Sequence, residues 1–120
     1  MRILFVGGLE FTGYNNKRMM ETIFNQLQYE WEGNNFTLIL GPRKGVDEMA
    51  IGIANKRKIP IEHYSVKPTW TEESKPDRLY LFPYKPSHRN KFIPRYLNLA
   101  MEAGVSIYEV RRPKDDHPSV

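Results

Sequence analysis

The chain alternates short apolar runs with longer stretches of helical spacing, and this alternation constrains its fold more than any other feature. Short apolar runs bounded by glycine, proline or polar residues are typical of strands buried in a parallel sheet. Five such runs occur, at residues 2–8, 36–41, 59–66, 77–83 and 105–110. Units of strand, helix and strand build sheets whose connections are right-handed. We therefore predict an α/β fold that is Rossmann-like and doubly wound, with a mostly parallel five-stranded sheet flanked by helices.

Helical spacing of apolar residues predicts three helices between these strands, at residues 16–32, 45–57 and 91–103. Gly104 is well placed to end the third helix. Pro94 predicts that this helix starts late or kinks, because proline is poorly tolerated deep in a helix. Residues 67–77 lack periodicity and predict a loop. We expect one domain over residues 1–112 and a polar tail over residues 113–120.

Composition narrows the class of protein and of partner. A chain of 120 residues fits a single domain, and no apolar run approaches the roughly 18 residues of a membrane span. The first apolar run is too short for a signal peptide and cysteine is absent, so a cytoplasmic protein is expected. The net charge of +4 favours an anionic partner, either nucleic acid or a small phosphorylated ligand. A merely solvated basic surface is the alternative.

Ligands of open parallel sheets bind beyond the carboxyl ends of the strands, where the strand order reverses. This rule selects the loops after the first, second and fourth strands, at residues 7–13, 41–47 and 83–91. We expect these three loops to meet in space.

The first two loops carry the features of a phosphate-binding edge. Gly7 and Gly8 allow a sharp turn and a close approach of backbone N–H groups to a ligand, although a tight turn without a ligand explains them equally. Arg43 and Lys44 precede a helix N-terminus, which itself favours anions. Asp47 could cap that helix, bind a ribose hydroxyl or only offset the helix dipole. The Gly-Lys-Ser/Thr of a Walker A loop is absent.

Other residue types give weaker indications. The histidines His63, His88 and His117 show no metal-ligand spacing, so no metal and no cofactor are expected. No Gly-x-Ser-x-Gly elbow of a serine hydrolase occurs. Trp70 and Tyr84 could stack on a base, but aromatic residues in loops more often cover the edge of a core.

The order and spacing of these motifs resemble the SLOG superfamily, and within it the small YspA-like branch. The resemblance spans about residues 2–110. The segments that match family motifs are GGLEF at residues 7–11, GPRKGVD at 41–47, KIPIE at 58–62, PTW at 68–70, FPYKPSH at 82–88 and AGVSI at 103–107.

Departures from the family pattern matter for activity. The glycine pair of the family's fourth-strand loop is replaced by Tyr84 and Lys85, and a helix before the fourth strand looks deleted. In LOG-type phosphoribohydrolases the same loop supplies a glutamate for cleaving the N-glycosidic bond, and here that position is Lys91. The resemblance therefore implies binding of a nucleotide-derived phosphorylated ligand, of the ADP-ribose or cyclic nucleotide type, without turnover. A sensor of antiphage signalling or a sequestering phage protein would act in this way.

We expect no catalytic residues and a ligand site built from fourteen residues, namely Gly7, Gly8, Glu10, Gly41, Arg43, Lys44, Gly45, Asp47, Trp70, Tyr84, Lys85, Ser87, His88 and Arg89. One alternative is a nucleotide-processing enzyme such as a phosphoribohydrolase, with Glu10 and Asp47 for acid–base work. A second alternative is nucleic-acid binding through the basic loops. The first predicted helix is more apolar than one sheet face needs, which predicts a homodimer or higher homo-oligomer unless that surface packs on the sheet.

Overall fold

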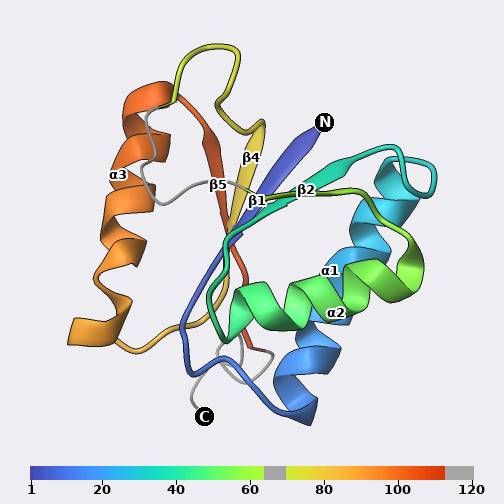
Figure 1. Ribbon diagram of the computed structural model, residues 1–120, viewed down its shortest axis with the longest axis horizontal. Coiled ribbons are helices and arrows are strands. Elements are labelled where there is room, and N and C mark those ends of the chain that lie inside the picture. The colour runs from blue at the N-terminus through green and yellow to red at the C-terminus, as the bar shows by residue number, and fades with distance from the viewer. Residues whose placement is uncertain (64–69, 113–120) are drawn as a thin grey trace, which may run out of the picture.

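The computed structural model describes residues 1–63 and 70–112. It confirms the α/β fold: five parallel strands form one sheet in the order β3-β2-β1-β4-β5 (Figure 1). The strands are β1 (Arg2–Val6), β2 (Thr37–Leu40), β3 (Ile61–His63), β4 (Arg78–Leu81) and β5 (Ser106–Glu109). The sheet grows outward from β1 in both directions, so the strand order reverses between β1 and β4.

The helices lie on both faces of the sheet, as double winding requires. Figure 1 shows α1 (Tyr14–Glu30) and α2 (Val46–Arg57) on one face and α3 (Phe92–Ala103) on the other. The side chains of β1 alternate between these faces. Phe5 packs in the cluster with α1 and α2, whereas Leu4 packs in the cluster with α3.

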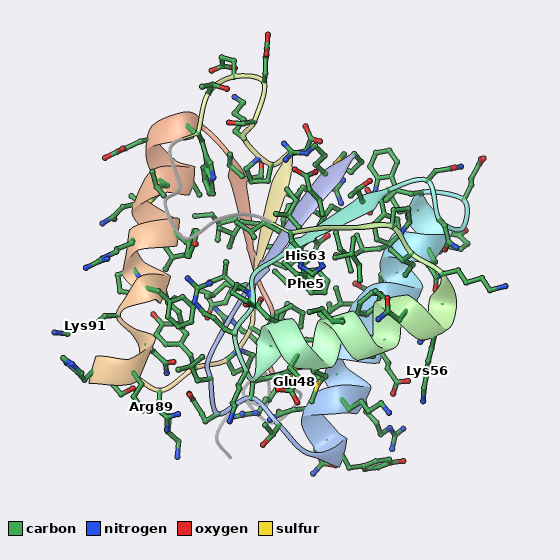
Figure 2. All side chains as sticks on the ribbon, in the orientation of Figure 1. Phe5, Glu48, Lys56, His63, Arg89 and Lys91 are labelled. Carbon is green, nitrogen blue, oxygen red and sulfur yellow. The ribbon has the colours of Figure 1, made fainter. Side chains whose placement is uncertain are left out.

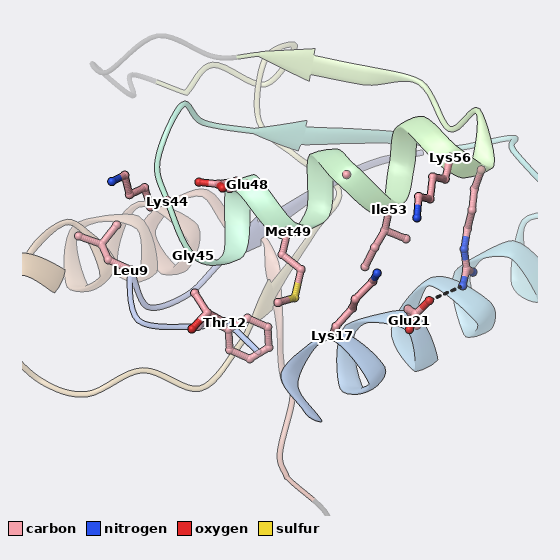
Figure 3. A pocket seen from close by; sticks show the side chains of 13 residues that line it. Leu9, Thr12, Lys17, Glu21, Lys44, Gly45, Glu48, Met49, Ile53 and Lys56 are labelled. Atoms are coloured by element: carbon pink, nitrogen blue, oxygen red, sulfur yellow. Dashed lines mark ion pairs between the residues drawn. The ribbon is translucent and has the colours of Figure 1, made fainter. Parts of the chain in front are cut away.

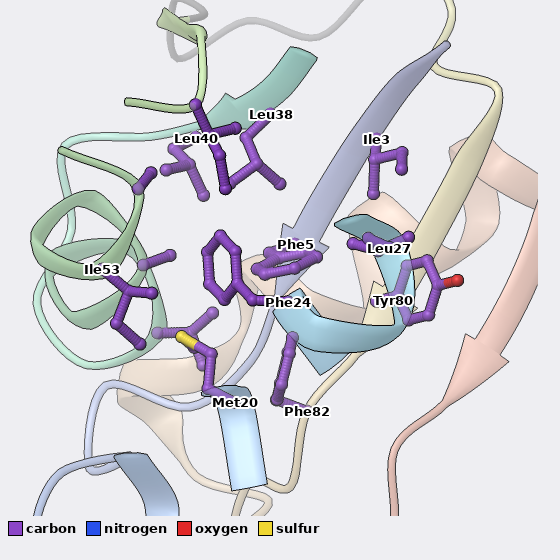
Figure 4. Packing of buried hydrophobic residues seen from close by; sticks show 14 of the residues in the cluster. Ile3, Phe5, Met20, Phe24, Leu27, Leu38, Leu40, Ile53, Tyr80 and Phe82 are labelled. Atoms are coloured by element: carbon purple, nitrogen blue, oxygen red, sulfur yellow. The ribbon is translucent and has the colours of Figure 1, made fainter. Parts of the chain in front are cut away.

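Aromatic rings organise the core under α1 and α2. The ring of Phe5 contacts Phe24, Tyr80 and Phe82 edge to face, at centroid distances of 5.5, 5.8 and 4.9 Å (Figure 4). These rings come from β1, α1, β4 and the residue just after β4. Phe5 therefore fixes the first helix and the fourth strand against the central strand.

The apolar side chains of α1 pack largely within the chain. Met20 and Phe24 are fully buried, and Met19 and Trp31 are partly buried against the same cluster. The apolar side chains of α1 that predicted a homo-oligomer thus pack mostly against the sheet. The homo-oligomer itself stays a prediction.

Helix ends differ from expectation by a few residues. α1 begins at Tyr14, two residues earlier than predicted, after Gly13 with a φ of 90°. α3 begins at Phe92, after a short 3-10 turn at His88–Asn90, and Gly104 ends it in the left-handed conformation. Pro94 thus does not delay the helix, because it lies in the first turn, where backbone N–H groups have no intrahelical acceptor.

The segment between β3 and β4 contains turns but neither helix nor strand over residues 70–77, in agreement with the predicted loop. The end of the third predicted strand, the positions 68 and 69 of the family-like motif and the predicted tail at 113–120 lie outside the described residues. None of the helices in the described part of the chain is long and apolar enough to cross a bilayer.

Candidate functional site at the carboxyl edge of the sheet

The loops after β1, β2 and β4 meet at the carboxyl edge, as the topology predicts. A Cβ atom on Gly7 would lie 2.4 Å from a methyl group of Val46 and 2.9 Å from Phe82. A Cβ atom on Gly45 would lie 2.2 Å from the carbonyl oxygen of Gly8, and Gly45 has a φ of 76°. Both glycines are therefore required by close packing of the loops, whether or not a ligand binds.

Glu10 and Asn90 join the loop after β1 to the loop after β4. The Glu10 Oε1 atom accepts a hydrogen bond of 2.6 Å from the backbone N–H of Lys85, and Oε2 accepts one of 2.9 Å from Asn90 Nδ2. Asn90 Nδ2 also donates to the Lys85 carbonyl at 2.8 Å, and Asn90 Oδ1 accepts from the Leu9 N–H at 3.1 Å. These bonds join the two loops at the place where the strand order reverses, between β1 and β4.

The charge on Glu10 is stabilised by this network. Burial acts to raise the pKa of Glu10, but the hydrogen bonds from the Asn90 side chain and the Lys85 N–H outweigh it and lower the pKa below its ordinary value. The carboxylate is therefore ionised at neutral pH and serves as an acceptor for the two loops. A group held in this way is poorly suited to donate a proton as a general acid.

Asn90 is the main residue of this edge that the sequence does not reveal. Its side chain is only 2% exposed, although its neighbours in the sequence, His88, Arg89 and Lys91, are polar. Its partners Leu9 and Glu10 are about eighty positions away in the chain. No local pattern could identify it as a buried bridge.

Asp47 points into the protein and holds the loop after β2. The side chain is 5% exposed and accepts a hydrogen bond of 3.3 Å from the backbone N–H of Arg43 and another from that of Gly41. Burial raises the pKa of Asp47 to about 6, and the nearby Arg43 guanidinium, at 3.8 Å, opposes this rise. Asp47 thus stabilises the loop after β2 through hydrogen bonds from its backbone. Its side chain does not cap α2.

Three of the expected ligand residues pack against the α3 side. The Arg43 guanidinium lies 4.2 Å from the ring centroid of Phe92 and 5.4 Å from that of Tyr96. The ring of Trp70 lies 6.3 Å from that of Tyr96, and Tyr84 is partly buried against the same cluster. These contacts fit the alternative in which the aromatic residues cover the edge of the core.

The remaining polar candidates are exposed at this edge. Lys44 precedes α2, and Lys85, Ser87, His88 and Arg89 follow β4. Figure 2 shows Arg89 and Lys91 projecting outward from the segment that leads into α3. Within residues 1–63 and 70–112, the charged groups of Lys44, Lys85 and Arg89 form no hydrogen bond or ion pair. They are available to an anion from solvent.

Fold and edge together define an α/β protein of the Rossmann-like class with a basic carboxyl edge. The chain matches no protein-family model, no curated protein and no solved structure. In the described part of the chain, no three histidine, aspartate or glutamate side chains are grouped as metal ligands.

Proposed function

We propose that the protein binds a nucleotide-derived phosphorylated ligand at the carboxyl edge of its sheet without turning it over, as a sensor or a sequestering protein. One observation carries this proposal. Two of the three loops that meet at this edge, those after β2 and β4, expose cationic side chains, whereas both candidate acid–base carboxylates, Glu10 and Asp47, are engaged in holding the loops together.

Phosphate binding follows from the placement of the cations. Lys44 stands next to the N-terminus of α2, where the helix dipole and free N–H groups favour negative charge. Lys85 and Arg89 add an ammonium and a guanidinium from the loop after β4, and Arg can bind phosphate through two parallel hydrogen bonds. His88 and Ser87 supply further donors. The resemblance to SLOG domains supports a ligand of the ADP-ribose or cyclic nucleotide type.

The proposal of binding without turnover rests on the two candidate acid–base carboxylates, Glu10 and Asp47, which are both engaged within the protein. Glu10 is ionised and accepts hydrogen bonds from both Lys85 and Asn90. Asp47 is buried beneath its own loop. The exposed Lys91, at the position of the hydrolase glutamate, would repel an oxocarbenium-like cation rather than stabilise it.

A thermal-shift screen tests the proposal with ADP-ribose, its cyclic isomers, AMP and cyclic nucleotides at millimolar concentration. We expect at least one ligand to raise Tm, since a ligand at about 100 times its Kd stabilises the folded state by roughly 2.7 kcal/mol. The double variant Lys44→Gln/Arg89→Gln should lose this shift. Lys58→Gln removes the same type of charge at the opposite end of α2 and should keep it.

Absence of a Tm shift with every ligand would refute binding at this edge. Chromatography of the ligand after long incubation tests the second half of the proposal. Intact ligand is expected, and release of a free base or of ribose phosphate would show that the protein is an enzyme.

A further inference from the structure

A groove between α1 and α2 lies beside the carboxyl edge and offers a second place for a ligand (Figure 3). Its volume is about 550 Å³, within the range of small-molecule sites. Apolar side chains line it, among them Phe11, Met49 and Ile53. Lys17 of α1 and Lys56 of α2 line it as well, so the groove combines apolar walls with positive charge.

The two lysines are not neutralised by the protein. Figure 3 shows their side chains extending from opposite helices into the same gap, next to Ile53. The nearby Glu21 is paired with Arg57 at 3.9 Å, and Arg57 also donates to Asn25 at 2.7 Å. Over residues 1–63 and 70–112, the ammonium groups of Lys17 and Lys56 form neither an ion pair nor a hydrogen bond. Four cations (Lys17, Lys44, Lys56 and Arg57) and two carboxylates (Glu21 and Glu48) line the groove, so its lining is positive on balance and favours an anion.

Gly52 gives an independent indication that the groove is kept open. It lies inside α2, where glycine is the least favourable residue after proline. A Cβ atom there would meet nothing within 4 Å, and the residue does not adopt a positive φ. Neither packing nor backbone conformation therefore requires glycine. Gly52 lies one turn before Lys56 and lines the groove, so a side chain at position 52 would enter the space beside that lysine.

We propose that this groove binds a small organic anion with an apolar body. The oxyanion head lies between Lys17 and Lys56, and the apolar part lies over Met49, Ile53 and Phe11. This site adjoins the one proposed at the carboxyl edge, since Lys44 and Gly45 line the groove as well, but its anion-binding pair, Lys17 and Lys56, lies outside that edge.

An NMR titration of the whole ¹⁵N-labelled chain tests this site with three probes. Phenyl phosphate combines both chemical features, inorganic phosphate has only the charge, and benzyl alcohol has only the ring. We expect phenyl phosphate to shift the amide signals of Lys17, Gly52 and Lys56 in a saturable manner, with a Kd at least about tenfold lower than that of either partial probe. The proposal is overturned if no saturable shift occurs, or if inorganic phosphate binds equally well.

Variants separate the groove from the rest of the molecule. Gly52→Leu fills the groove with a residue that favours helix, so the variant should fold and should bind phenyl phosphate at least about tenfold more weakly. Gly52→Ala is the matched control, with a change of less than about threefold. Lys17→Gln and Lys56→Gln should each weaken binding by about three- to tenfold. Lys58→Gln, which removes the same charge outside the groove, should have no effect. Undiminished binding by Gly52→Leu would disprove the groove as the site.

Discussion

Asp47 lies in a loop expected to bind ligand, yet its carboxylate is turned into the protein. Burial makes ionisation costly and raises the pKa of Asp47 to about 6 from an ordinary value near 4, although the Arg43 guanidinium and the backbone N–H groups oppose this rise. Between about pH 4 and pH 6 the folded state therefore holds this proton more tightly than the unfolded state does. The contribution of Asp47 to stability accordingly falls as the pH rises through this window, and above it the cost of burying the charge is fully present.

The variant Asp47→Asn keeps an acceptor for the loop N–H groups but cannot titrate. We expect the native protein to lose roughly 2 kcal/mol relative to this variant as the pH rises from 4 to 7, because a pKa shift of one unit corresponds to about 1.4 kcal/mol and the loss begins just below pH 4. Urea unfolding of both proteins at several pH values measures the difference. Parallel stability profiles would show that the proton on Asp47 is not linked to folding.

At the scale of elements, Asn90 connects the loop after β1 to the loop after β4, which are distant in sequence. Its side chain is 2% exposed and forms partly buried hydrogen bonds with Leu9, Glu10 and Lys85. The Asn90 amide thus acts together with the Glu10 carboxylate to fix the mutual position of the loops after β1 and β4. Because these loops form most of the proposed ligand edge, Asn90 acts as a positioning residue for it.

Asn90→Ala should destabilise the fold by about 2 kcal/mol, since it leaves buried partners without hydrogen bonds. Urea unfolding gives this value. The exposed Asn98→Ala in α3 is the control and should change stability by less than about 0.5 kcal/mol. Amide hydrogen exchange should also accelerate at Leu9 and Lys85 in Asn90→Ala alone. Equal stability of the two variants would contradict the role given to Asn90.

The strands and helices were predictable because each leaves a local period in the sequence. The apolar runs at 2–8 and 36–41 became β1 and β2, and the spacing of Met20, Phe24 and Leu27 became the buried face of α1. Local patterns also placed the three loops at one edge. They could not show where side chains point within that edge.

Contacts between helices and loops determine the directions of side chains that the sequence could not predict. The guanidinium of Arg43 lies against the rings of Phe92 and Tyr96 on α3, and the expected role of Arg43 in holding phosphate stays a prediction. The sequence does not distinguish Lys17 and Lys56 from ordinary solvated residues on a helix. Their significance depends on the distance between α1 and α2, which no pattern within either helix contains.

For the whole molecule, the positions of the cationic side chains in the structure indicate which partners the excess positive charge favours. The net charge of +4 could describe an evenly solvated surface. Instead, over residues 1–63 and 70–112, cations without a hydrogen bond or ion pair gather at the carboxyl edge, at Lys44, Lys85 and Arg89, and again at Lys17 and Lys56 in the groove between α1 and α2. The groove runs along α2, from Lys44 and Gly45 at its N-terminus to Lys56 in its last turn. Small anions are therefore the partners that this charge distribution favours over a long nucleic acid, which would need a continuous basic track.

The most direct test of the central claim is an amide chemical-shift map of the carboxyl edge with ADP-ribose, AMP and a cyclic nucleotide. We predict saturable shifts at Gly8, Lys44, Gly45 and Lys85 with at least one ligand, unchanged in Gly52→Leu and lost in Lys44→Gln/Arg89→Gln. No saturable shift at these four amides with any of the ligands would contradict the proposed function.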